Sequence, residues 1–273
     1  MPQPSLPPEI LDDMVDLLRN EPEALKKCCL VSKSWIPLTR RHLFLNIRFD
    51  TEKRLRSWKE TFPDPSTSPA QYTKTLIVDC LQAVTAAEAG AGSWIRGFSC
   101  VVRLEVRGGR MDIDESENSL RLFHGFSPAL KTLRVTLHAP PFSQLFDLIL
   151  SFPSLEDLSV FGYNLFICDG SYGLSTAVQP PSPLMTGSLN LFQKGGIGSV
   201  ARWLLSLPSG IHFRNVALKC CRGEDLLLAM ALVDRCSQTI ESLQIACAFF
   251  STSTRYLRPH RQLIPVSSRV GVN

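Results

Sequence analysis

The chain has 273 residues, 44% of them hydrophobic and 20% charged, which is typical of a globular protein rather than a disordered one. Its net charge of +4 equals the four arginines after residue 250, because residues 1–250 hold 25 basic and 25 acidic side chains. A charge-balanced body argues against a nucleic-acid-binding protein. The longest apolar run has eight residues, far short of the ~20 that a membrane-spanning helix needs.

The nine cysteines and the first residues of the chain indicate an intracellular protein. No Cys-x-x-Cys pair and no Asn-x-Ser/Thr sequon occurs, and the start of the chain is acidic, without the basic and apolar regions of a signal peptide. We therefore expect a soluble protein of the cytoplasm or nucleus with no membrane partner. Its thiols should be reduced, and most should be small core residues.

The stretch from Leu6 to Phe44 has the pattern of three short helices. Pro7 and Pro8 suit a helix start, residues 20–22 end the first helix and begin the second, and Pro37 begins the third. The first helix has a broad apolar face, wider than one core-facing stripe, made by Ile10, Leu11, Met14, Val15, Leu17 and Leu18. This surplus could be buried against another protein or against the rest of this chain, and periodicity alone leaves both open.

The same stretch resembles an F-box, whose pattern is roughly Leu-Pro-x-Glu-hydrophobic-hydrophobic, a gap, Cys-x-x-Val-Ser-Lys-x-Trp and a closing aromatic. The matching residues are Leu6, Pro7, Glu9, Ile10, Leu11, Cys28, Val31, Ser32, Lys33 and Trp35, with Phe44 as the closing aromatic. The resemblance is to F-box proteins of the fungal type, and it covers only about the first 44 residues. It implies docking on a Skp-type adaptor, and through it on a cullin, through Leu6, Pro7, Glu9, Ile10, Leu11, Leu30, Val31 and Trp35.

Three features connect this stretch to the rest of the chain. Leu45, Ile47 and Phe49 alternate with polar residues, which predicts a short half-buried strand. Residues 52–62 have the spacing of an amphipathic helix, with Leu55, Trp58 and Phe62 on one side. Residues 63–69 are rich in proline and serine, so we place a domain boundary there.

Short strand-like cores recur through the remainder of the chain, at residues 76–78, 104–106, 133–135, 158–160, 189–191, 216–218 and 243–245. Their starts are 28, 29, 25, 31, 27 and 27 residues apart, and helical patterns lie between them at residues 142–150, 197–207 and 223–236. This rhythm resembles degenerate leucine-rich repeats, which implies a curved solenoid with a parallel sheet on its concave side. An ordinary α/β domain with alternating elements is the other interpretation.

We therefore predict an α/β fold in which a small helical F-box-like bundle (residues 1–49) precedes a leucine-rich-repeat-like solenoid (residues 71–250). Residues 50–70 form a linker helix and loop, residues 168–187 a loop insertion, and residues 251–273 a disordered basic tail. On the concave face, specificity is expected from side chains flanking the strands: Glu105, Arg107, Arg134, Thr136, Ser159 and Asn190.

No catalytic constellation is evident in the sequence. Residues 196–201 fit Gly-x-Gly-x-x-Ala before a helix, but no acidic residue follows at the end of a second strand, as a dinucleotide site requires. The acidic run of Asp112, Asp114, Glu115 and Glu117 is better interpreted as a solvated loop than as a cation site. The five histidines are scattered.

The sequence predicts a non-catalytic protein with no metal or cofactor. We expect a substrate-recognition subunit of an SCF-type ubiquitin ligase that binds a protein target and no nucleic acid. The alternative is an interaction scaffold outside any ligase, whose N-terminal helices cap the repeat array.

Overall fold

A computed structural model describes residues 7–80, 94–110, 120–138, 142–163, 185–193, 196–208, 210–220 and 223–247. These residues contain seven α-helices and eight β-strands, all in a single parallel sheet. The predicted α/β class is therefore confirmed. Several sequence predictions lie outside the described residues: Leu6, the acidic run, the basic tail and most of the predicted insertion.

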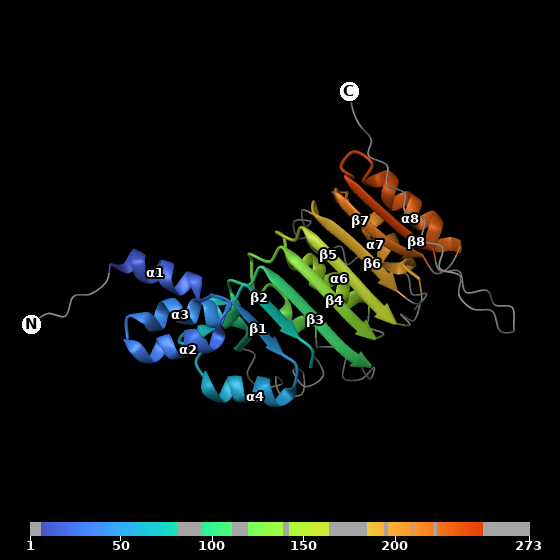
Figure 1. Ribbon diagram of the computed structural model, residues 1–273. Helices are drawn as coiled ribbons and strands as arrows, with labels where there is room; N and C mark the ends of the chain where they lie inside the picture. The colour runs from blue at the N-terminus through green and yellow to red at the C-terminus, as the bar shows by residue number, and fades with distance from the viewer. Residues whose placement is uncertain are drawn as a thin grey trace, which may run out of the picture.

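Three helices precede the sheet: α1 (Pro8–Leu17), α2 (Pro22–Val31) and α3 (Trp35–Leu43). A proline stands at the start of both α1 and α2, where its missing N–H removes no helical hydrogen bond. Helix α3 packs against both of the others (Figure 1). Its buried Thr39 hydroxyl donates to the Trp35 carbonyl at 2.8 Å and lies 2.9 Å from Cys29 Sγ on α2.

The strands follow one another across the sheet in chain order, and every neighbouring pair is parallel (Figure 1). They are β1 (Asn46–Phe49), β2 (Thr75–Val78), β3 (Arg103–Arg110), β4 (Thr132–His138), β5 (Asp157–Tyr163), β6 (Ser188–Gln193), β7 (Asn215–Cys220) and β8 (Ser242–Cys247). All seven strand cores that the sequence predicts fall within β2–β8, and the strand expected at residues 45–49 is β1.

Helices connect the strands: α4 (Glu52–Thr61), α6 (Phe142–Leu150), α7 (Gly198–Ser206) and α8 (Gly223–Arg235). Within the described ranges, three short 3-10 helices supplement them: η1 (Pro69–Tyr72), η2 (Trp94–Phe98) and η4 (Arg121–Phe123). Figure 1 shows α6 and α7 behind the sheet, and α7 also packs against α8. Parallel strands joined in order by crossovers of one hand place their connections on the same face. We call the opposite face the open face.

Two rows of apolar side chains run across the sheet toward the helices. The first row is Ile47, Leu76, Leu104, Leu133, Leu158, Leu189 and Val216, and each member is at most 8% exposed. The second row, from Phe49 to Leu218, is buried in the same way. Because strand side chains alternate between faces, in-register pairing stacks the apolar residues of successive strands into one continuous core.

The sheet begins before the boundary that we predict at residues 63–69. Strand β1 pairs with β2 across that loop, with Ile47 opposite Leu76. The ring of Trp58 on α4 lies 5.9 Å from that of Phe44, 5.8 Å from that of Phe49 and 5.7 Å from that of Phe98. The linker helix is therefore part of the core at the start of the sheet, where its Leu55 is 1% exposed.

Candidate interaction surfaces

Helix α1 has two apolar stripes, of which one is buried and the other is exposed. Leu11 and Val15 are 9% and 0% exposed and face the neighbouring helix. The second stripe lies one residue earlier at the same spacing, and its members Ile10, Met14 and Leu17 are 46%, 41% and 84% exposed. Helix α1 packs against α3, and a ten-residue helix that packs with one side buries only one of these stripes. The other remains accessible to a second protein.

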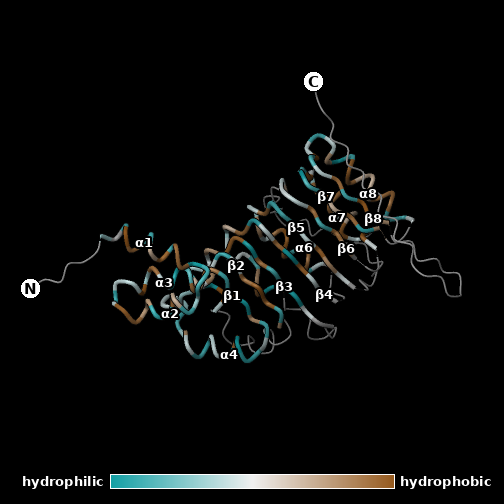
Figure 2. Tube along the Cα trace, viewed as in Figure 1, coloured by the Kyte–Doolittle hydropathy of each residue, from teal (hydrophilic) through white to brown (hydrophobic). Residues whose placement is uncertain are grey.

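Helix α2 adds exposed apolar side chains at its end. Leu30 is 86% exposed and Val31 is 68% exposed, whereas Leu25 near the start of the same helix is 1% exposed. In Figure 1 the turn between α2 and α3 points away from the sheet, as does the beginning of α1. Figure 2 shows apolar segments along both helices. We call Ile10, Met14, Leu17, Leu30 and Val31 the helical apolar surface.

The residues that the F-box resemblance assigns to adaptor binding differ in accessibility. Pro7 and Glu9 are exposed beside Ile10, and Trp35 is half-buried at the start of α3. Leu11 is buried, so it supports the helix packing and does not itself offer contact area. Sequence reasoning left Met14 and Leu17 out of the site, although their spacing of four and seven residues from Ile10 marks them as the same stripe.

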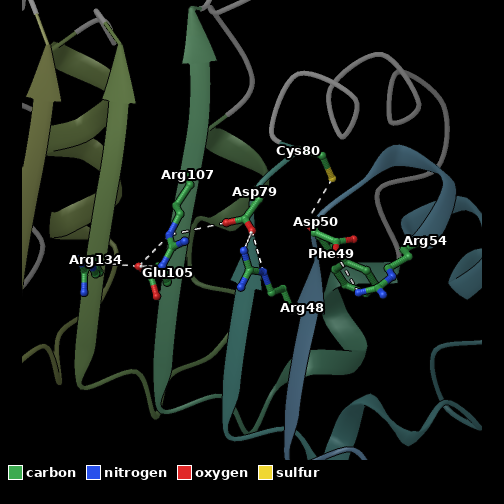
Figure 3. Close-up of polar contacts among 9 residues, drawn as sticks. All are labelled: Arg48, Phe49, Asp50, Arg54, Asp79, Cys80, Glu105, Arg107 and Arg134. Carbon is green, nitrogen blue, oxygen red and sulfur yellow. Dashed lines mark hydrogen bonds and ion pairs between the residues drawn. The ribbon is translucent and has the colours of Figure 1, made fainter.

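The open face of the sheet has an ion-pair network between neighbouring strands (Figure 3). Asp79 lies between two arginines, 2.7 Å from Arg48 Nε and 3.6 Å from Arg107 Nε. Glu105 lies between Arg107 Nη2 at 2.8 Å and Arg134 Nε at 3.0 Å. The hydrogen bond to Glu105 raises the pKa of Arg107 above its ordinary value, so this guanidinium is charged at any physiological pH. The network thus holds three cations around two anions.

An aromatic pair continues the open face beyond this network. The rings of Phe161 on β5 and Phe192 on β6 are stacked, with centroids 5.3 Å apart and planes only 3° from parallel. The Arg134 guanidinium lies over the other face of Phe161, 4.6 Å from its centroid. In the neighbouring row, Asn190 Nδ2 donates to Ser159 Oγ at 3.0 Å. The register places the six expected specificity residues in these two rows.

The Gly-x-Gly-x-x-Ala segment has a structural explanation. Asp225 of α8 is 1% exposed, and its carboxylate accepts a hydrogen bond from the Ile197 N–H at 3.0 Å. Gly196 has a φ of 103°, and a Cβ there would lie 2.7 Å from Asp225 Oδ1. A protein carboxylate thus occupies the start of α7, where a dinucleotide phosphate would have to bind.

Side chains of the types that bind metal ions do not cluster in the described part of the chain. No group of three or more histidine, cysteine or acidic side chains there could hold a metal ion. The seven cysteines within the described ranges form no disulfide with one another, and burial raises the pKa of both Cys80 and Cys236. Among the described helices, none is long and apolar enough to cross a bilayer.

Comparison with known proteins leaves the family open. No protein-family model matches the chain, and no curated protein matches it significantly.

Proposed function

We propose that this protein is a substrate-recognition subunit of an SCF-type ubiquitin ligase. In this proposal α1–α3 dock on a Skp-type adaptor as an F-box does, and the sheet binds a protein target. Ubiquitin transfer is carried out by other subunits of the ligase. The observation that carries the proposal is the helical apolar surface: among the described residues, eight large apolar side chains are exposed, and five of them lie on α1 and α2.

The energetics of docking fit this surface. Fully burying one large apolar side chain contributes ~1.5–3 kcal/mol, so five contribute roughly 7–15 kcal/mol. Association costs about 4–15 kcal/mol in lost translational and rotational freedom. A stable complex therefore needs most of the five side chains, and docking should be sensitive to a change at any one of them.

The sheet suits target binding because its open face is continuous. We propose that its strands are degenerate leucine-rich repeats arranged as a solenoid, each with one strand and one helical or 3-10 connection. Support comes from the strict chain order of the eight parallel strands and from their spacing of 25–31 residues. Such an arrangement presents side chains from every strand on one surface.

A second candidate is a scaffold outside any ligase, in which the N-terminal helices only cap the sheet. One observation favours it: the end of α3 is tied to the start of the sheet. Thr73 is fully buried, and its hydroxyl donates to the Phe44 carbonyl at 2.9 Å. Capping leaves the exposed stripe of α1 unexplained, which is why we favour the adaptor proposal.

Co-purification with an adaptor and cullin tests the choice. We expect the Leu30→Asp/Val31→Asp double variant of the full chain to lose a co-expressed Skp-type adaptor while it stays folded. Leu227→Asp is the matched control, because Leu227 is 70% exposed on α8 at the other end of the sheet. Undiminished adaptor binding by the double variant, or no binding by the unmodified chain, would overturn the proposal in favour of the scaffold.

A further inference from the structure

We propose that the open face of β1–β7 binds an extended, acidic protein segment that carries aromatic or large apolar side chains. This inference rests on the proposed function, because such a segment would be the feature by which the receptor selects its target. It is drawn from the charges and rings of the open face and not from α1–α3. The two proposals can therefore fail separately.

The cations of this ion-pair network are more exposed than its two anions. The side chains of Arg48, Arg107 and Arg134 are 51%, 40% and 47% exposed. Those of Asp79 and Glu105 are only 15% and 10% exposed. A partner that approaches this face meets guanidinium groups first, with one positive charge in excess of the two carboxylates. Charge complementarity therefore favours carboxylate side chains on the partner.

The aromatic pair gives this basic surface an apolar anchor point. Phe161 and Phe192 are only half-buried although they are large aromatic residues. One face of Phe161 meets Arg134 and the other meets Phe192, so the ring edges remain for contact with a partner. Ring edges bear partial positive charge and attract carboxylate and carbonyl oxygens, while their area favours apolar contacts. Lys219, exposed and in register beyond Phe192, adds a cation on the far side of the pair.

The arrangement fits a protein segment better than a nucleic acid. Bases bind by stacking on free aromatic faces, and Phe161 already has Arg134 and Phe192 against its ring, so the pair offers a base at most the outer face of Phe192. A peptide can place single carboxylates opposite the exposed arginines and neutral residues beside the Asp79 and Glu105 carboxylates, whereas a phosphate backbone carries a negative charge at every nucleotide.

The dimensions of the face set the length of the segment. Neighbouring strands lie ~4.8 Å apart, so the six steps from β1 to β7 span roughly 29 Å. An extended peptide rises ~3.3 Å per residue, so about nine residues cross the whole surface. Three or four acidic residues with one aromatic residue near the Phe161–Phe192 pair would match its features.

Fluorescence anisotropy with synthetic peptides on the purified full chain tests the inference. The probe is a labelled peptide of about nine residues, rich in glutamate with a central phenylalanine. Its comparison probes carry lysine for glutamate or serine for phenylalanine, and an oligothymidine of similar length represents nucleic acid. The variants are Phe161→Ala/Phe192→Ala and Arg134→Gln. Met230→Ala and Arg202→Gln are their controls, because both residues are exposed on helices.

We expect only the acidic aromatic peptide to bind well, and we expect its affinity to fall as salt rises. Each open-face variant should weaken it about tenfold, as loss of a central anchor does, and the controls should not. No binding, equal binding of the lysine peptide, tighter binding of the oligothymidine or unaltered affinity in both open-face variants would overturn the inference. The open-face variants should still bind the adaptor, and Leu30→Asp/Val31→Asp should still bind the peptide, so a failure is assigned to one proposal.

Discussion

Leucines of the sheet and leucines of the N-terminal helices have opposite environments. Leu76, Leu104 and Leu133 are fully buried, whereas Leu17 and Leu30 are 84% and 86% exposed. In the sheet each apolar row is covered by the next strand and by the connecting helices. In α1 and α2 there are more apolar side chains than the neighbouring helices cover. The comparison indicates that apolar side chains in the sheet stabilise the fold, while those of the helical apolar surface are available for binding.

The last strand shows what the sheet looks like where a neighbour is absent from the described residues. Leu243 of β8 continues the row that includes Leu189 and Val216, which are 0% and 2% exposed, yet it is 37% exposed itself. Leu227 and Met230 on α8 are exposed at the same end. Exposure of an apolar residue here thus follows from position in the array and not from residue type.

The largest expected difference in stability is between a leucine-to-alanine change in the sheet and the same change in the N-terminal helices. Leu133→Ala should destabilise the protein by about 2–5 kcal/mol, because it leaves a cavity in a fully buried row. Leu30→Ala should change stability by about 0.5 kcal/mol or less. Urea unfolding of both variants measures the difference. A comparable loss in Leu30→Ala would mean that the helical surface is not free, and the contrast would break down.

Gly196→Ala tests how closely the start of α7 packs against Asp225 of α8. The left-handed φ of 103° and the 2.7 Å approach to Asp225 Oδ1 should together cost about 1–3 kcal/mol. Gly223→Ala is the control, because a Cβ there meets nothing within 4 Å. Thermal unfolding of the two variants measures the cost. Equal midpoints would show that the contact between α7 and α8 tolerates an extra carbon.

The pH dependence of stability tests whether His124, which directly follows η4, is partly buried. Desolvation lowers the pKa of His124, and Arg121 lowers it further, while Asp147 opposes the shift. The unfolded chain then takes up this proton at a higher pH than the folded chain, so stability should fall as pH drops below about 6.5. The stability of the His124→Gln variant should fall less steeply with decreasing pH. The His212→Gln variant, changed at an exposed position, should show the same pH dependence of stability as the unmodified protein. Parallel curves for all three in urea unfolding between pH 7 and 5 would refute the assignment.

The smallest effect is expected on the open face, which we interpret as a binding surface. Arg48→Ala removes an ion pair to Asp79 whose arginine is 51% exposed, so it should cost under about 1 kcal/mol. The loss should shrink further at about 1 M salt, where exposed charges are screened. Denaturant unfolding at low and high salt checks both points. A decrease in stability of more than about 2 kcal/mol would show that the ion-pair network stabilises the fold.

Much of the sheet could be predicted from local pattern. The recurring strand-like cores coincide with β2–β8, the alternation at residues 45–49 coincides with β1, and the helical pattern at residues 142–150 coincides with α6. The predicted boundary at residues 63–69 was less informative, because it lies between two paired strands. Proline and serine mark a loop but do not reveal whether the strands on either side of it pair. The adaptor-docking role and the target of the open face stay predictions.

The amino-acid sequence by itself determined the periodicities: which residues form strands and helices, and which stripes of them are apolar. Only the tertiary structure decided which of the two stripes on α1 is buried, that Asp225 occupies the start of α7, and that Arg48 pairs with Asp79 and Glu105 with Arg134 on one face. The physical reason is register. Residues 25–31 positions apart become neighbours only when the strands pair, and burial depends on the neighbours that pairing supplies.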